Sequence, residues 1–234
     1  MTLAQLRAQA LNRLGVLPWE EEAPVLNFAL ARNAINDAYR WFAARTLCHY
    51  DHDRSEAVTT PTARYALDAD VIRLKVDAVR FLLTAGGTYT QLEQRRLGSL
   101  IVQYGALEGA STGTPAAYHA EMGGEANDAP AVIRLVPAPS GNGTLYYGCY
   151  YYPAELTAEA DRPQLSEAEQ HRLIAPICWK LAEAARGAGS EIADPARWEA
   201  QAEREAAEFY ALLHGGGIPR VQGRAETPLT GGRK

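Results

Sequence analysis

The chain has 234 residues, 47% of them hydrophobic, and a formal net charge of −5 at pH 7. A chain of this length can bury a core without disulfides or metal ions. Its acidic balance excludes a general basic field that would hold nucleic acid by its phosphates. The cysteines Cys48, Cys149 and Cys178 lack the close spacing of a structural zinc site. With no long apolar run and no signal-peptide pattern, we expect a soluble protein made in a cytoplasm.

Two helices are predicted at the N-terminus. Thr2 and Gln5 form a capping-box signature in front of an amphipathic stretch that ends at Gly15. From Pro24 to about Thr46, apolar residues recur at helical spacing and predict a longer helix.

The next hundred residues have the two-residue alternation of β-strands, and they are interrupted by turn residues. Residues 54–62 are polar and are predicted to form a loop. Gly86 and Gly87 predict a hairpin turn. The strands are expected at residues 64–67, 72–76, 79–83 and 88–92. The pattern of residues 97–104 fits either a helix or a strand, and a short helix that starts near Gln94 is favoured.

Residues 114–156 combine strand alternation, paired prolines and a run of tyrosines. Residues 131–135 and 144–152 alternate as strands do, and the segment 137–143 between them must turn because Pro137 and Pro139 cannot continue a ladder. The stretch therefore predicts a β-hairpin or meander. Its second strand carries Tyr146, Tyr147, Tyr150, Tyr151 and Tyr152.

The C-terminal part predicts an antiparallel pair of helices. Ser166 and Glu169 form a second capping box, and Pro176 is expected to kink the helix that follows, at a cost of about 3 kcal/mol. Asp194 with Pro195 marks the start of the last helix. The tail, residues 214–234, is rich in Gly and Pro and is expected to need a partner to become ordered.

Few residues have the types or spacing that chemistry requires. His49 and His52 beside Asp51 and Asp53 are the only close cluster of metal-ligand types, and no third or fourth ligand is indicated. A solvated segment after the helix is therefore the favoured interpretation. No nucleophile elbow or phosphate-binding loop occurs, and the acidic pairs lie in polar surroundings, so no enzyme is predicted.

The tyrosine strand could stack unpaired bases, but residues 145–152 contain no Lys or Arg, which such platforms usually interleave with their aromatics. The favoured interpretation is that one set of tyrosine rings packs in the core and the other lies at a protein interface. Tyrosine is common at interfaces because its ring is apolar and its hydroxyl can stay in water.

The order of elements is two helices, an antiparallel β region, two helices and a tail. Four short motifs accompany this order: Thr114-Pro115-x-x-Tyr118, the run from Ile133 to Pro139, Leu145-x-Tyr147 and Tyr152-Pro153-x-x-Leu156. Together with the order of elements, they resemble the head–tail adaptor (connector, or head-completion) proteins of tailed bacteriophages. Among these proteins, the chain is most similar in size to the tubular adaptors. The likeness extends over most of the chain and is densest in residues 114–156.

The resemblance implies an α+β fold in which N- and C-terminal helices (residues 1–50 and 157–213) form a bundle around an antiparallel β insertion (residues 51–156), with an extended tail (residues 214–234). It implies a virion protein in the neck that forms a homo-oligomeric, dodecameric ring between portal and tail (or nozzle) proteins. Double-stranded DNA would pass through its lumen, and no cofactor, metal or membrane is expected. The candidate interface residues are Tyr146, Tyr150, Tyr152, Ile218, Pro219, Arg220, Val221, Arg224 and Leu229.

Two other classes remain open. A nucleic-acid-binding regulator with a helical dimer and a β wing would need a basic recognition helix, whereas the strongest helices have acid-rich faces. A metal-assisted enzyme would use His49 and His52.

Overall fold

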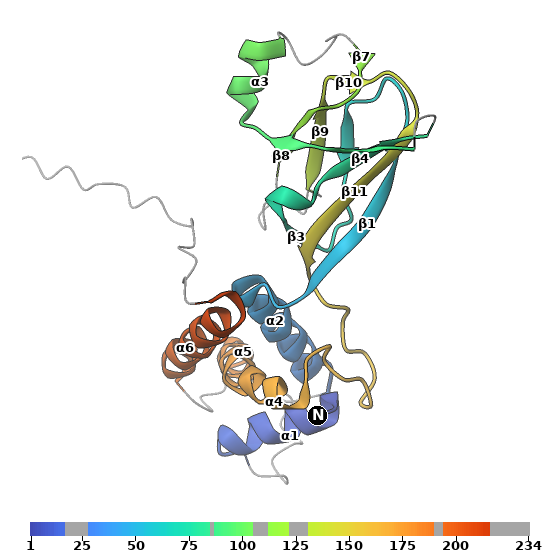
Figure 1. Ribbon diagram of the computed structural model, residues 1–234. Helices are drawn as coiled ribbons and strands as arrows, with labels where there is room; N and C mark the ends of the chain where they lie inside the picture. The colour runs from blue at the N-terminus through green and yellow to red at the C-terminus, as the bar shows by residue number, and fades with distance from the viewer. Residues whose placement is uncertain (17–27, 85–86, 105–111, 122–130, 190–193, 216–234) are drawn as a thin grey trace, which may run out of the picture.

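The computed structural model describes residues 1–16, 28–84, 87–104, 112–121, 131–189 and 194–215. The fold is α+β, as predicted, and combines helices with mostly antiparallel sheets. Figure 1 shows an elongated molecule with most helices at one end and the sheets at the other. Among the described residues, no helix combines the length and apolar character that a membrane crossing needs.

Helices flank the strand region on both sides in the sequence, and the short helix α3 lies within it. Their residues are α1 (Leu3–Arg13), α2 (Phe28–Thr46), α3 (Leu97–Tyr104), α4 (Glu167–Gln170), α5 (Ile174–Gly187) and α6 (Pro195–His214). The predicted capping boxes at Thr2 and Ser166 are present. Asp194 caps α6 through its side chain, and Gly215 ends this helix in the left-handed conformation, which glycine adopts readily.

The helix expected to kink at Pro176 is instead interrupted before this residue. A short 3₁₀ turn, His171–Leu173, separates α4 from α5, so Pro176 is the third residue of α5. The first turn of a helix tolerates proline, because its N–H groups have no partner within the helix.

Helices from both ends of the chain share one hydrophobic core. Phe42 of α2 stacks on Phe209 of α6, with ring centroids 5.4 Å apart, and Trp198 and Phe209 are both buried. The core comprises Leu3, Leu6, Ala10, Leu11, Leu14, Ala31, Ala34, Ile35, Ala38, Tyr39, Phe42, Leu156, Leu173, Ile174, Ala175, Ile177, Cys178, Trp179, Leu181, Ala182, Trp198, Ala202, Ala206 and Phe209. Tertiary packing therefore joins α1 and α2 to α5 and α6.

The strands form two larger sheets and one small one. The strands are β1 (Tyr50–Val58), β2 (Arg64–Ala66), β3 (Val71–Leu74), β4 (Arg80–Leu83), β5 (Tyr89–Gln91), β6 (Glu93–Gln94), β7 (Thr112–Gly113), β8 (Ala117–Glu121), β9 (Val132–Val136), β10 (Ala138–Pro139) and β11 (Gly143–Tyr151). The order is β1-β11-β4-β5 with β3 also on β11, and β2-β9-β8-β6 in the second sheet; β7 pairs with β10. The predicted hairpin between β4 and β5 is present.

The predicted hairpin of residues 131–152 is wrong. β9 pairs with β2 and β8, whereas β11 pairs with β1, β3 and β4, so the two strands belong to different sheets. Their buried side chains, such as Ile133 of β9 and Tyr147 of β11, meet in one core. Alternation gave the buried face of each strand correctly, but it carries no information about the neighbouring strand.

The predicted loop at residues 54–62 is wrong for residues 54–58, which belong to β1, whereas residues 59–62 form a turn, as predicted. This strand is polar because it lies at the edge of its sheet and much of it is exposed. Its conformation comes from antiparallel pairing with β11.

Gly148 interrupts the tyrosine run of β11 for a packing reason. A Cβ atom at this position would collide with the Tyr50 hydroxyl and with the Cβ atom of Ala78. The glycine therefore lets the Tyr50 ring lie across β11.

A buried asparagine of α2, Asn36, forms two hydrogen bonds with the segment that links β11 to α4. The Asn36 amide nitrogen of α2 donates to the Leu156 carbonyl at 3.0 Å, and the Leu156 N–H donates to the Asn36 amide oxygen at 2.9 Å. Both bonds are buried, so they satisfy backbone groups that water cannot reach.

We expect Asn36→Ala to lower the free energy of unfolding by about 2 to 4 kcal/mol, because it leaves two buried backbone groups of Leu156 without partners. Urea denaturation followed by tryptophan fluorescence measures this change. Asp37→Ala is the matched control, since Asp37 is exposed on the same helix and should shift the value by less than about 0.5 kcal/mol. Equal effects of the two substitutions would contradict the assignment.

Candidate protein interfaces

The tyrosines of β11 divide between the two faces of the sheet. Tyr147 is 1% exposed and packs in the sheet core, while Tyr146 and Tyr150 on the opposite face are half-buried. Part of the sequence interpretation is therefore confirmed: one ring is in the core. The half-buried rings are the surface for which an interface was predicted.

Tyr146 belongs to a surface cluster of two tyrosines and an arginine. Its ring contacts Tyr89 of β5 edge-on, with centroids 5.5 Å apart, and the Arg80 guanidinium lies within 6 Å of both rings. The sequence of β11 gave no sign of this cation, because Arg80 comes from β4. An ion pair of 2.9 Å with Asp53 offsets its charge.

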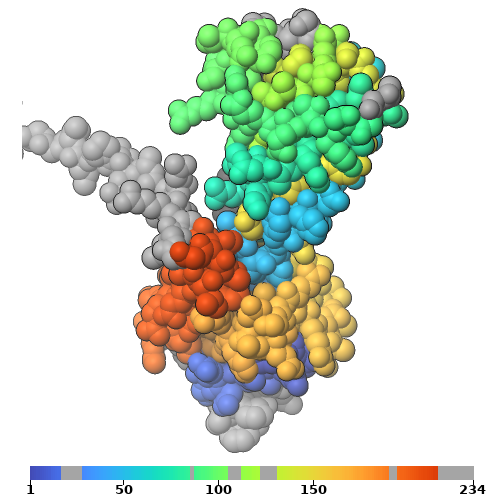
Figure 2. Space-filling model, viewed as in Figure 1, coloured from blue at the N-terminus to red at the C-terminus, as the bar shows by residue number. Residues whose placement is uncertain are grey.

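Tyr150 lies where the sheets meet the helices. Its ring lies 5.2 Å from that of Tyr50 and 6.1 Å from that of His214, the last residue of α6. Nε2 of His214 is within hydrogen-bonding distance, 3.1 Å, of the Thr46 carbonyl at the end of α2. Tyr150 therefore has a contact within the chain, and Figure 2 shows that the molecule narrows at this junction.

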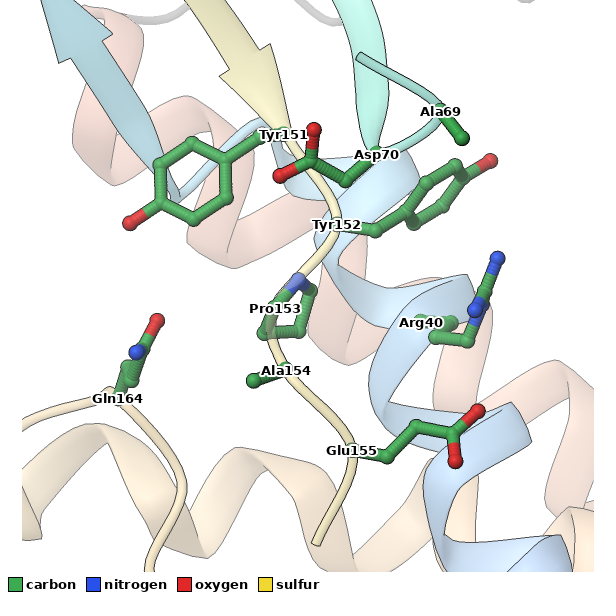
Figure 3. A pocket seen from close by; sticks show the side chains of 9 residues that line it. All are labelled: Arg40, Ala69, Asp70, Tyr151, Tyr152, Pro153, Ala154, Glu155 and Gln164. Atoms are coloured by element: carbon green, nitrogen blue, oxygen red, sulfur yellow. The ribbon is translucent and has the colours of Figure 1, made fainter. Parts of the chain in front are cut away.

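Tyr152 lines a pocket of about 430 Å³, formed where the segment that follows β11 passes α2 and the loop before β3. Figure 3 shows Arg40 from α2, with its guanidinium 4.7 Å from the centre of the Tyr152 ring, and the carboxylates of Asp70 and Glu155 nearby. The pocket therefore brings one cation, two carboxylates and an aromatic ring together at the surface.

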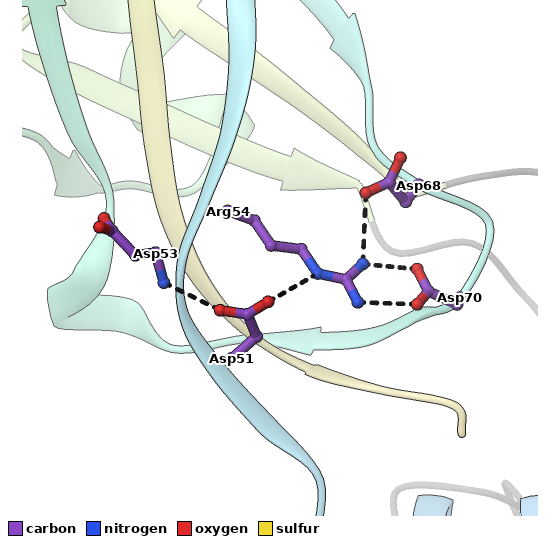
Figure 4. A network of polar contacts seen from close by, with 5 residues as sticks. All are labelled: Asp51, Asp53, Arg54, Asp68 and Asp70. Carbon is purple, nitrogen blue, oxygen red and sulfur yellow. Dashed lines mark hydrogen bonds and ion pairs between the residues drawn. The ribbon is translucent and has the colours of Figure 1, made fainter. Parts of the chain in front are cut away.

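An arginine in the middle of β1, Arg54, contacts three acidic residues (Figure 4). Arg54 binds Asp70 with two parallel bonds of 2.6 and 2.8 Å, and it also contacts Asp51 and Asp68. These carboxylates, Asp70 foremost, raise the pKa of the guanidinium above its ordinary value. Because Asp68 and Asp70 precede β3, the network ties that loop to β1, with two negative charges in excess.

The predicted interface residues in the tail are not placed. Ile218, Pro219, Arg220, Val221, Arg224 and Leu229 lie outside the described residues.

His49 and His52 do not come together as metal ligands. His49 is 5% exposed and packs between Tyr39 and Tyr151, so the interpretation as a solvated segment is wrong for this residue. His52 is exposed on β1. Across the part of the chain that the structure describes, no group of three His, Cys, Asp or Glu side chains is arranged to hold a metal ion.

Several residues of these surfaces were not predicted from the sequence. Arg40, Arg80 and His214 come from other elements than the tyrosines they contact, and their charges have no periodic signal along the chain. Arg54 was not singled out because its partners lie up to 16 residues away.

Comparison with known protein families identifies a match over nearly the whole chain. A family model described as "SU10 adaptor protein" matches residues 1–229. No curated protein matches the chain.

The burial of His49 predicts a pH dependence of stability. Burial lowers the pKa of the imidazole, an effect that the nearby Glu169 carboxylate opposes, and Nε2 has no hydrogen-bond partner among the described residues. A lowered pKa means that the unfolded chain binds the proton more readily below about pH 6.5. The contribution of His49 to stability should therefore fall as the pH falls through that value.

We expect His49→Leu to reduce the loss of unfolding free energy between about pH 7 and pH 5, the range in which an unfolded histidine takes up its proton. Urea titrations at several pH values measure it. His52→Leu, at an exposed position of β1, should leave the pH profile as in the wild type. Parallel profiles for wild type and His49→Leu would rule out this role.

Proposed function

Since the chain belongs to the SU10 adaptor protein family, we propose that it forms a ring between the portal and the tail of a bacteriophage particle. The family match over residues 1–229 is the observation that carries this proposal. It agrees with the resemblance to phage head–tail adaptors found in residues 114–156.

The two-ended architecture supports an adaptor role. One hydrophobic core lies among the helices and a second lies between the sheets, and the two ends of the elongated molecule therefore offer different surfaces (Figure 1). A protein that joins two unlike rings needs such a pair of ends. We propose that residues 1–50 and 157–213 act as a helical bundle facing the portal, with residues 51–156 inserted as a β domain facing the tail.

The proposed ring is a dodecamer with closed rotational symmetry. Each subunit in such a ring must present two different surfaces that fit each other, a heterologous contact. The tyrosine cluster around Tyr146 is a candidate for one of them, because tyrosine and arginine are enriched at interface centres. The tail residues from Ile218 to Leu229 are candidates for contact with the portal.

Double-stranded DNA would pass through the lumen without sequence readout. A mildly acidic chain fits this role, because a lining that bound phosphates tightly would impede passage.

The mass of the native particle, measured with and without portal rings of the same phage, tests the proposal. We expect a ring of subunits on each portal ring, and free monomers are compatible with assembly on the docking ring alone. A stable dimer that shifts the mobility of DNA would instead favour a nucleic-acid-binding regulator.

We expect Tyr146→Ser to weaken assembly on portal rings or binding of the tail protein by at least about fivefold, since truncating a central interface tyrosine commonly costs more than 1 kcal/mol. The variant should fold, because Tyr146 is half-buried on the outer face of the sheet. Sedimentation with portal rings and with tail protein measures both affinities.

Val102→Ser is the control, because it removes an 89% exposed apolar side chain from α3, away from the tyrosine cluster. Unchanged affinities for Tyr146→Ser would remove this cluster from the interface.

A further inference from the structure

β1 has one paired side and one free side. It is an edge strand of its sheet, and its register partners all belong to β11. Within the described ranges, no strand pairs with the other side of β1. β1 has nine residues, and beyond an irregularity between Asp51 and Arg54 its ladder with β11 is regular from Arg54 to Val58. The free side of this regular stretch is long enough to accept another strand.

The hydrogen bonds of β11 show which groups of β1 point to the free side. The carbonyls of Asn142 and Gly148 accept from Thr84 and Lys75, on the side of β11 that faces β4 and β3. Backbone groups alternate in direction along a strand, so even-numbered residues of this strand face away from β1 and odd-numbered residues face toward it.

Ser55 and Ala57 stand opposite the even-numbered residues Tyr146 and Thr144. Their N–H and C=O groups therefore point away from β11, toward the free side. Both residues are exposed and have small side chains, so another backbone could approach closely. Arg54, Glu56 and Val58 stand opposite odd-numbered residues and bond to β11.

Acidic side chains accompany this edge. β1 carries Asp51, Asp53 and Glu56 with a single arginine, Arg54. Arg54 pairs with Asp51 and Asp70, and Arg80 of β4 pairs with Asp53, so Glu56 is the acidic residue of β1 without an ion pair among the described residues. Lysine and proline on an edge strand commonly prevent another strand from pairing with it, and β1 contains neither residue. The acidic side chains along β1 therefore favour a partner strand with basic side chains.

The C-terminal tail begins beside the base of β1. His214, two residues before the tail segment 216–234, contacts Tyr150 and lies 3.1 Å from the Thr46 carbonyl, and Tyr150 is the register partner of Tyr50, the first residue of β1. A tail starting there can reach the whole of β1, because an extended chain spans about 3.3 Å per residue.

The sequence of the tail fits the edge. It has three arginines and one lysine against one glutamate. Pro219 and Pro228 bracket the segment 220–227, in which every residue retains its N–H group. With eight residues, it is the longest stretch of the tail with an uninterrupted row of donors and acceptors.

We propose that in the free protein the segment 220–227 adds as a strand to the free edge of β1 of the same chain. Because the tail starts at the base of β1, it runs parallel to this strand, as β6 does to β8. The ladder satisfies the backbone groups of Ser55 and Ala57 and places basic side chains beside an acidic strand. The inference does not rest on the ring proposal; any partner that takes up the tail must first displace it from β1.

Hydrogen exchange of the full chain at residue resolution tests this pairing. In the wild type, the amides of Ser55 and Ala57 should exchange as slowly as those of Arg54, Glu56 and Val58. In the double variant Val221→Pro/Ala225→Pro, whose tail cannot form a ladder, exchange at Ser55 and Ala57 should accelerate by at least about tenfold. The amides bonded to β11 should not change, which shows that the fold is intact.

Gly231→Pro, outside the bracketed segment, is the matched control and should behave as the wild type. Fast exchange at Ser55 and Ala57 in the wild type, or no acceleration in the double variant, would overturn the proposal. Protection that disappears on about hundredfold dilution would also overturn it, because the strand would then come from a second copy.

Discussion

The pairing of β11 with its neighbours is the interaction on which the rest of the structure depends. β11 bonds to β1 on one side and to β3 and β4 on the other, and its inward residues Leu145, Tyr147 and Cys149 lie in the sheet core. Beyond Tyr151 the same chain enters the helices, where the buried Asn36 bonds hold Leu156. One continuous segment therefore organises the sheets and attaches them to the helices.

Polar and aromatic side chains make contacts at the junction between helices and sheets. His214 of α6 contacts Tyr150 of β11 and the Thr46 carbonyl of α2, and Arg40 of α2 lies over the Tyr152 ring just beyond β11. Such contacts resemble those of a modest interface within a chain, which holds two cores in relation without merging them. For an adaptor, this separation allows each end to match a different partner.

Much of the fold followed from local chemistry in the sequence. Thr2, Ser166 and Asp194 marked helix starts correctly, because capping depends on neighbouring residues. β1 was missed because an exposed edge strand has no apolar alternation, and the hairpin was wrong because alternation does not specify strand partners. The surface clusters around Tyr146 and Arg54 depend on residues brought together by the fold, so no spacing could indicate them.

Electron cryo-microscopy of the neck of the virion tests the central claim most directly. The account predicts a ring of density between portal and tail into which the chain fits as repeated copies, with α1, α2, α5 and α6 next to the portal and the sheets toward the tail. A neck without this chain, or with the sheets against the portal, would contradict it.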